Sequence, residues 1–276
     1  MKKLLLLFCI GALPLYAQKT SEQIYREVTL PASPTEVSLE VYNLLGTIKV
    51  EGYPGNKILV VVDKKISGND ESKVEKAVKE FELGIETTGN TVQLFTKTPY
   101  DTRPGNKNIN QSGYSIRLNY SIKVPKDINI KLSTINDGSI QVTGVDGRIK
   151  ATNINGGIKA AGVKKPTDLQ TINGEIEVAY SSNTLDGSRC KTLNGSIHVT
   201  CLPDVSADFQ LKTMNGHFYT DFSEAELERK TAVKSEKSEG TTRYKLNSNT
   251  HLTLGNGESH MHFETMNGSI YIKKKN

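Results

Sequence analysis

The phrase that decides the fold of this chain is Thr171-Ile-Asn-Gly-Glu-Ile176, which returns one repeat later as Thr192-Leu-Asn-Gly-Ser-Ile197. A typical copy consists of an apolar residue, a spacer, Thr, a large apolar residue and Asn-Gly, followed by a strand-like segment; in the copy at Leu132, Asp137 separates Asn136 from Gly138. Six copies, the second of them degenerate, begin at Leu132, Ala151, Leu169, Cys190, Leu211 and Phe263. Successive asparagines of the phrase are 19, 18, 21, 21 and 52 residues apart. A period near 20 residues indicates a repeat architecture in which each unit covers its neighbour's core.

Strict alternation of polar and apolar residues follows each Asn-Gly, as in Ser196-Ile-His-Val-Thr-Cys201. Such a period of two, with β-branched residues, is typical of a half-buried strand. We therefore expect two strands and two bends per repeat, and an all-β fold: a β-helix-like solenoid with coils of 18–21 residues and Asn-Gly turns. The alternative is an antiparallel β-meander or sandwich, because Asn-Gly is also a strong hairpin signal. The regular spacing of the inward residues favours the solenoid.

The recurring Thr and Asn of the phrase have a structural interpretation. Stacked polar side chains hydrogen-bond along a column in cross-β-like arrangements, and Asn also suits turns. The Gly of the phrase accepts a positive φ at little cost, which a tight bend requires. We therefore expect these residues to build the fold rather than to bind a ligand.

Four segments are expected along the chain. Residues 1–17 have a basic start, a short apolar run and a small residue before the expected cut, which predicts a signal peptide. Residues 18–36 form an N-terminal lead-in. Residues 37–125 form a diverged β region, and residues 126–276 hold the regular repeats.

Two of these segments contain irregular parts. In the diverged region we expect a short helix at 70–81, a hairpin at 85–96 around Gly89-Asn90, and a long loop at 98–113. In the repeat region the interval of 52 residues holds an insertion at 223–247, predicted to be a polar helix or a mobile excursion. The last copy of the phrase is expected to close the rod.

Composition and spacing exclude several function classes. The formal charge is +5, and no run of like charge indicates nucleic acid binding. No later apolar stretch predicts a transmembrane segment after signal cleavage. No catalytic constellation, metal site or cofactor motif is recognisable: His260 and His262 share a face without a third ligand. Glu175 and Glu177 are better explained as a solvated face than as the acid pair of a polysaccharide-cleaving enzyme. We therefore expect a protein that is not an enzyme.

Two cysteines follow the predicted signal peptide, Cys190 and Cys201. Export would allow a disulfide between them. Each also occupies a slot that is apolar in other repeats, so two core thiols are the other interpretation.

The longest unpatterned stretch, the loop at 98–113, is the candidate binding region. Long loops on rigid scaffolds often carry function, and Tyr and Arg are common in interface hot spots. The residues predicted to contact a partner are Tyr100, Arg103, Tyr114 and Tyr120.

The phrase, with its strands on both sides of Asn-Gly, resembles a bacterial family. These are exported β-strand-repeat proteins grouped as adhesins, a domain of unknown function related to auto-transporter adhesin head domains. The likeness covers residues 37–273 and includes the final Thr265-Met-Asn-Gly-Ser-Ile270. It implies a Gram-negative envelope and brings no catalytic residues with it.

Together the sequence predicts an exported, non-enzymatic adhesin or cell-envelope scaffold. Its expected location is the periplasm, the outer membrane or the extracellular space. Its expected partner is a protein or glycan of the envelope or of a host surface. The alternative is a carbohydrate-binding or carbohydrate-active envelope protein.

Overall fold

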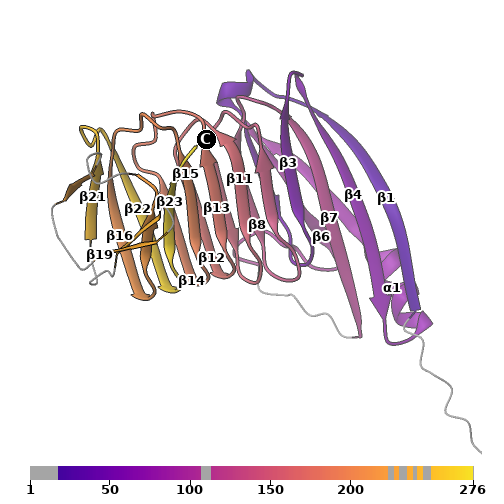
Figure 1. The fold of residues 1–276 in the computed structure, drawn as a ribbon. Helices are drawn as coiled ribbons and strands as arrows, with labels where there is room; N and C mark the ends of the chain where they lie inside the picture. The colour runs from indigo at the N-terminus through magenta and orange to yellow at the C-terminus, as the bar shows by residue number, and fades with distance from the viewer. Residues whose placement is uncertain are drawn as a thin grey trace, which may run out of the picture.

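The computed structural model describes residues 18–106, 113–222, 227–229, 235–238, 241–244 and 250–275, so the predicted signal peptide lies outside it. The chain folds into two large mixed β-sheets (Figure 1), which confirms the all-β class. Sheet A contains, in spatial order, β1 (Gln18–Thr29), β4 (Lys57–Gly68), β7 (Tyr114–Pro125), β3 (Ile48–Tyr53), β9 (Ile140–Thr143), β11 (Ile158–Val163), β13 (Ile176–Tyr180), β15 (Ile197–Cys201), β23 (Ile270–Lys274), β17 (Phe218–Thr220), β20 (Thr241–Tyr244) and β19 (Ser235–Ser238). Sheet B contains β18 (Leu227–Arg229), β21 (Thr250–Leu254), β16 (Ala207–Asn215), β22 (Ser259–Asn267), β14 (Arg189–Asn194), β12 (Thr167–Asn173), β10 (Ile149–Asn153), β8 (Asn129–Thr134), β2 (Ser38–Tyr42), β6 (Thr91–Thr98) and β5 (Glu82–Thr88).

Successive repeats pair as parallel strands in both sheets. In sheet A, Ile176 lies opposite Ile158 on one side and Ile197 on the other. In sheet B, Leu169 lies opposite Cys190. We call the two strands of one repeat, one in each sheet, a rung. Because neighbouring rungs place the same position of the phrase side by side, the repeats stack in register and do not form antiparallel hairpins with one another.

The rungs do not follow the order of the sequence at either end of the stack. The rung of β22 and β23 lies between that of β14 and β15 and that of β16 and β17. The rung of β2 and β3 likewise lies between that of β6 and β7 and that of β8 and β9. The expectation that the last copy closes the rod is therefore wrong, since it lies inside the stack.

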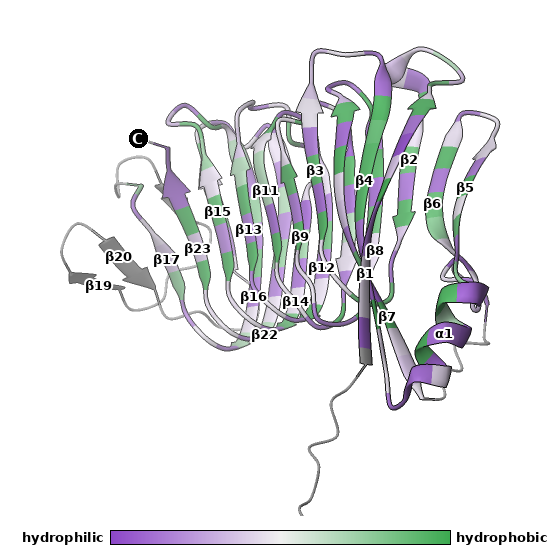
Figure 2. Ribbon diagram, turned by 90° about the vertical axis from the view of Figure 1, so that its right-hand side faces the viewer, coloured by the Kyte–Doolittle hydropathy of each residue, from purple (hydrophilic) through white to green (hydrophobic). Residues whose placement is uncertain are grey.

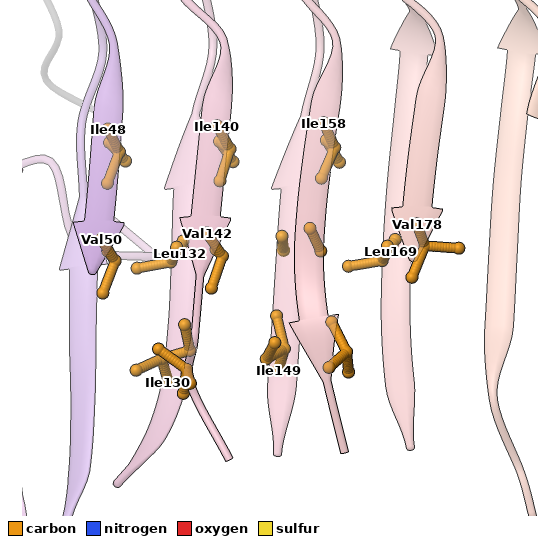
Figure 3. Close-up of a cluster of buried hydrophobic side chains, with 14 of the residues drawn as sticks. Ile48, Val50, Ile130, Leu132, Ile140, Val142, Ile149, Ile158, Leu169 and Val178 are labelled. Carbon is orange, nitrogen blue, oxygen red and sulfur yellow. The ribbon is translucent and has the colours of Figure 1, made fainter. Parts of the chain in front are cut away.

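The inward residues of both sheets form one apolar core. Side chains of β3, β9 and β11, among them Ile48, Ile140 and Ile158, belong to the same buried cluster as Ile130 and Leu169 of sheet B (Figure 3). The alternating bands of hydropathy along the strands follow from the side-chain period of two (Figure 2). Burying each such side chain contributes about 1.5–3 kcal/mol.

Cys190 and Cys201 are free and buried in this core. Cys190 occupies the slot that the neighbouring rungs fill with Leu169 and Phe263, whereas Cys201 lies opposite Lys274 near the end of β23. Burial raises the pKa of the Cys201 thiol to about 12 and raises that of Cys190 as well. Both are therefore protonated packing residues in this conformation.

The Thr and Asn of the phrase connect neighbouring rungs, as predicted. The Thr192 hydroxyl donates a hydrogen bond of 2.9 Å to the carbonyl oxygen of Gly174, and four further Thr copies do the same to a glycine of the rung before. In the degenerate copy, the side-chain amide of Asn153 takes the place of the Thr and donates to Gly138. The Asn side chains form a second column, in which each Nδ2 donates a hydrogen bond of 2.6–2.8 Å to Oδ1 of the Asn in the preceding rung. In spatial order the column is Asn136, Asn155, Asn173, Asn194, Asn267 and Asn215.

The glycines of the phrase have a different role from the one expected. Of the six, all within the described residues, Gly156 and Gly195 alone have a positive φ, at 157° and 154°. In every copy, however, a Cβ atom would overlap the carbonyl oxygen of a glycine in the neighbouring rung, as for Gly174 against Gly156. Close approach of stacked backbones therefore requires glycine here, and turn conformation is secondary.

The N-terminal end contains the predicted helix and hairpin. Helix α1 (Glu71–Glu80) begins after Asp70, whose carboxylate accepts a hydrogen bond of 2.9 Å from the Lys73 amide. It lies against β1, β4 and β7 at one end of the molecule (Figure 2). Strands β5 and β6 pair as the hairpin, and a short 3-10 helix covers Pro34–Glu36.

Two expectations for the irregular segments change. The lead-in at 18–36 contains the 12-residue edge strand β1, paired with β4 along its whole length. In the predicted insertion at 223–247, the described parts are strands β18, β19 and β20 rather than a helix. Within the described part of the chain, no helix combines the length and the apolar character needed to cross a membrane.

Candidate contact surfaces

Two of the four predicted contact residues are inside the protein. Tyr120 points into the core from β7, between the inward Leu118 and Ile122, and is fully buried. Tyr100 is 4% exposed. Burial raises the pKa of Tyr120 far above its ordinary value, so the phenol stays neutral. Neither ring forms a contact surface in this conformation. The period of two at Tyr114–Pro125 is the sequence signal that places Tyr120 inward.

Arg103 is engaged within the protein. Its guanidinium makes a bidentate contact with Asp101, at 2.6 Å between Nη2 and Oδ2 and 3.1 Å between Nε and Oδ1. It also lies 2.7 Å from Oε2 of Glu86 and stacks 3.9 Å above the centre of the Phe95 ring. The hydrogen bond to Asp101 raises the pKa of Arg103 above its ordinary value. Arg103 therefore fastens this segment to the hairpin of β5 and β6.

Tyr114 is the remaining predicted contact residue. It is half-buried, and its hydroxyl lies 3.4 Å from Oε2 of Glu80 on α1. Residues 107–112 of the predicted loop lie outside the described part of the chain. Of the three tyrosines in this set, Tyr114 alone has a partly accessible ring.

The structure brings together an aromatic row that the sequence does not reveal. His198 of β15, Tyr271 of β23 and Tyr219 of β17 are register partners on the outer face of sheet A. The rings of His198 and Tyr271 stack with centroids 4.5 Å apart, and those of Tyr271 and Tyr219 with centroids 4.7 Å apart. The interplanar angles are 2° and 7°. We call these three residues the aromatic row.

A charged pair continues the aromatic row along sheet A. Glu177 is the register partner of His198, and its carboxylate lies 2.6 Å from Nζ of Lys159 on the next strand. Burial lowers the pKa of His198, with Lys273 acting in the same direction and Glu175 and Glu177 opposing it. The imidazole is therefore held toward its neutral form, which stacks on a phenol without the cost of desolvating a charge.

A groove runs along the outer face of sheet B. Its volume is about 580 Å³, and one wall is formed by the large apolar residue of the phrase in successive rungs, Ile154, Ile172, Leu193, Met266 and Met214. Gln170, Lys191, Glu264 and Lys212 form the facing wall. We call this feature the ladder groove.

Two further histidines of the described surface make polar contacts. His260 contacts Asp186 at 3.1 Å, and His262 contacts the side chain of Gln210 at 3.1 Å. Among the described residues, no group of three or more His, Cys, Asp or Glu side chains is placed to hold a metal ion.

The chain resembles several solved structures. A proposed cell adhesion protein from Clostridium sporogenes is 13% identical with a TM-score of 0.39, and the match covers 93% of this chain and 100% of that one. A proposed adhesin from Bacteroides fragilis is 11% identical with a TM-score of 0.36, covering 92% and 97%. A proposed lipid-binding protein from Parabacteroides distasonis is 12% identical with a TM-score of 0.29, covering 93% and 97%.

Identities of 11–13% and TM-scores between 0.29 and 0.39 carry no argument about what this chain does. No protein-family model matches the chain, and no curated relative matches its sequence.

Proposed function

We propose that this chain is an exported, non-enzymatic β-solenoid that serves as an adhesin or as a scaffold of the cell envelope. The parallel stacking of rungs in both sheets supports the solenoid. The predicted signal peptide supports export. The recurring Thr and Asn are used in hydrogen bonds between rungs, which leaves the outer faces of the sheets as the surfaces for recognition.

The aromatic row is the contact surface in this proposal, and it is the observation that carries it. The three rings lie outside the core, on the face opposite the buried Ile197 and Ile270. Tyr is enriched among residues that dominate interface energetics, since it adds a large area with few rotatable bonds. The rigid sheet fixes the spacing of the rings, so little conformational entropy is lost when a partner binds.

The stacking favours a protein partner over a glycan. A sugar ring packs against an open aromatic face, but both faces of Tyr271 are covered, one by His198 and the other by Tyr219. A partner would therefore meet the edges of the rings rather than their faces, and protein side chains supply such edge-to-face contacts. Binding to a glycan is the second candidate and would use the rim of the row.

The test is the double variant Tyr219→Ser with Tyr271→Ser. We expect it to lose attachment to cells or isolated envelopes while retaining the thermal unfolding temperature to within a few degrees. The matched control is Tyr25→Ser, since Tyr25 is 63% exposed on the edge strand β1, outside the aromatic row. Unchanged attachment by the folded double variant would remove the aromatic row from the proposal.

A glycan panel separates the candidate functions. Binding that the double variant abolishes, without release of reducing ends, would move the assignment to a carbohydrate-binding protein. Release of reducing ends by the purified wild-type protein would make it an enzyme and contradict the proposal. We expect the wild-type protein to attach to cells or isolated envelopes and neither to bind nor to cleave any glycan of the panel.

A further inference from the structure

One position of the phrase has no structural explanation in the stack. The large apolar residue between Thr and Asn points outward in every rung, so it contributes neither to the core nor to the two hydrogen-bonded columns. Pairing of the flanking Thr and Asn residues keeps these side chains in register. At about 4.8 Å per strand, six of them make a stripe about 24 Å long. In spatial order they are Ile135, Ile154, Ile172, Leu193, Met266 and Met214.

The stripe is contiguous and exposed to solvent at the C-terminal rungs. The exposed fractions are 42% for Ile172, 42% for Leu193, 39% for Met266 and 67% for Met214. Single apolar residues on a surface need no explanation, but a contiguous apolar patch rimmed by polar residues marks a binding surface. The stripe also forms one wall of the ladder groove rather than a flat face, so a ligand in it would be held from two sides.

The facing wall adds positive charge. Nζ of Lys191 lies 3.3 Å from one oxygen of Glu264, and Nζ of Lys212 lies 3.2 Å from the other. One carboxylate between two ammonium groups leaves a net positive charge at this point of the groove. Both lysine side chains are about half exposed, so they can reorient toward a ligand without breaking core contacts.

Two classes of ligand do not fit the ladder groove. The strands beneath it, β12, β14, β22 and β16, each pair with a strand on either side, so their backbones have no free edge for an added peptide strand. The described residues that line the groove include no aromatic ring, so a sugar has no stacking partner. Aliphatic and thioether side chains suit a hydrocarbon chain, and Met adapts its shape to one.

We infer that the ladder groove binds one long-chain fatty acid. Its hydrocarbon chain lies along Ile172, Leu193, Met266 and Met214, and its carboxylate contacts Lys191 and Lys212. The groove volume of about 580 Å³ is within the range of small-molecule sites, which combine an apolar lining with a few polar groups. This ligand is independent of the adhesive contact, because the aromatic row belongs to the other sheet.

Titration calorimetry with palmitate, below the concentration at which it forms micelles, tests the inference. We expect saturable binding with one molecule per chain. The double variant Met214→Gln with Met266→Gln should weaken binding at least about tenfold, since two apolar contacts are replaced by polar ones of similar size. The single variant Met214→Gln, at the most exposed position, should weaken it in the same direction and serves as a second measurement if the double variant unfolds.

The charge is tested separately. Lys191→Gln with Lys212→Gln should weaken palmitate binding and leave binding of the uncharged hexadecanol unchanged. The matched control is Val78→Gln, an exposed apolar residue on α1, which should bind palmitate as the wild type does. Tyr219→Ser with Tyr271→Ser should also leave palmitate binding intact, so failure of the adhesin proposal and failure of this one are distinguishable.

Three outcomes would overturn the inference. The first is the absence of saturable palmitate binding to the wild type. The second is equal binding by the wild type and the folded Met variants. The third is association only with phosphatidylglycerol vesicles and not with monomeric palmitate, which would make the groove a membrane contact instead.

Discussion

The imidazole ring of His198 lies flat against the phenol ring of Tyr271, with centroids 4.5 Å apart and planes 2° apart. This contact joins two strands whose paired residues are 73 positions apart in the sequence but are direct neighbours in space. It places a titratable group inside a stack of rings, where burial disfavours its charged form. The stability of the stack therefore depends on pH.

Burial of His198 lowers its pKa below the ordinary 6.5, so the unfolded chain binds a proton more readily than the folded chain does. The contribution to stability is fully present above about pH 6.5 and is lost as the pH falls through the lowered pKa. We expect the free energy of unfolding in urea to fall between about pH 7.5 and about pH 5.5, and to fall less for His198→Gln. Equal slopes for the two proteins would contradict the assignment.

The core positions of the rungs carry the stability of the fold. Ile176 and Ile197 are fully buried, and replacing either with Ala should cost about 2–5 kcal/mol, because a cavity is left between stacked rungs. Replacing the outward Glu175 or Ser196 with Ala should cost less than about 0.5 kcal/mol. Urea denaturation of the four variants measures the difference. Similar losses at inward and outward positions would show that the two faces are assigned incorrectly.

The glycines of the phrase lie close to the backbone of the neighbouring rung, so replacing one with Ala should destabilise the fold through steric overlap and not through its φ angle. Gly174→Ala should destabilise the protein by about 2–4 kcal/mol, since its Cβ would overlap the carbonyl oxygen of Gly156. The control is Gly187→Ala, where φ is 82° but no atom lies within 4 Å of the added Cβ, and the cost should be about 1–2 kcal/mol. Thermal unfolding of both variants checks the order, and a larger loss for Gly187→Ala would reverse it.

The two buried thiols should be unreactive in the folded protein. Burial raises the pKa of Cys201 to about 12, and the thiolate is the reactive form of cysteine. We expect iodoacetamide to modify Cys190 and Cys201 only when denaturant is added. Mass spectrometry of the intact mature protein, prepared without reductant, should find both thiols free. A mass lower by two hydrogens would show that the exported protein carries the disulfide instead.

Much of the fold is predictable because the phrase repeats. Alternation identifies the inward residues, and the similar spacing of successive phrases predicts that Asn155, Asn173 and Asn194 stack on one another. The helix at 70–81 is predictable from its apolar spacing and from Asp70 at its start. These features depend on residues close together in the sequence.

The features that the sequence does not predict depend on distant segments. Strand β1 has few inward apolar residues, since it lies at the edge of sheet A, and its pattern is weak. The aromatic row forms because β23 lies between β15 and β17, an order that the spacing of the phrases does not contain. From the sequence, Arg103 is expected to contact a partner. In the structure its guanidinium contacts Glu86 and Phe95, which lie in the hairpin of β5 and β6 and are not its neighbours in the sequence.

The place of β22 and β23 in the stack has a consequence for how the chain assembles. Strands β14 and β16 carry the same phrase, with Thr192 and Thr213 as equivalent positions, and both bind β22 in the same register. During synthesis, the matching edges of β14 and β16 are therefore both present before residues 259–274 have been added to the chain. If β14 and β16 pair directly, that contact has to open before residues 259–274 can take their place between them. In the native order, this end of the sheet holds a segment inserted between two earlier rungs rather than one more layer added to the end.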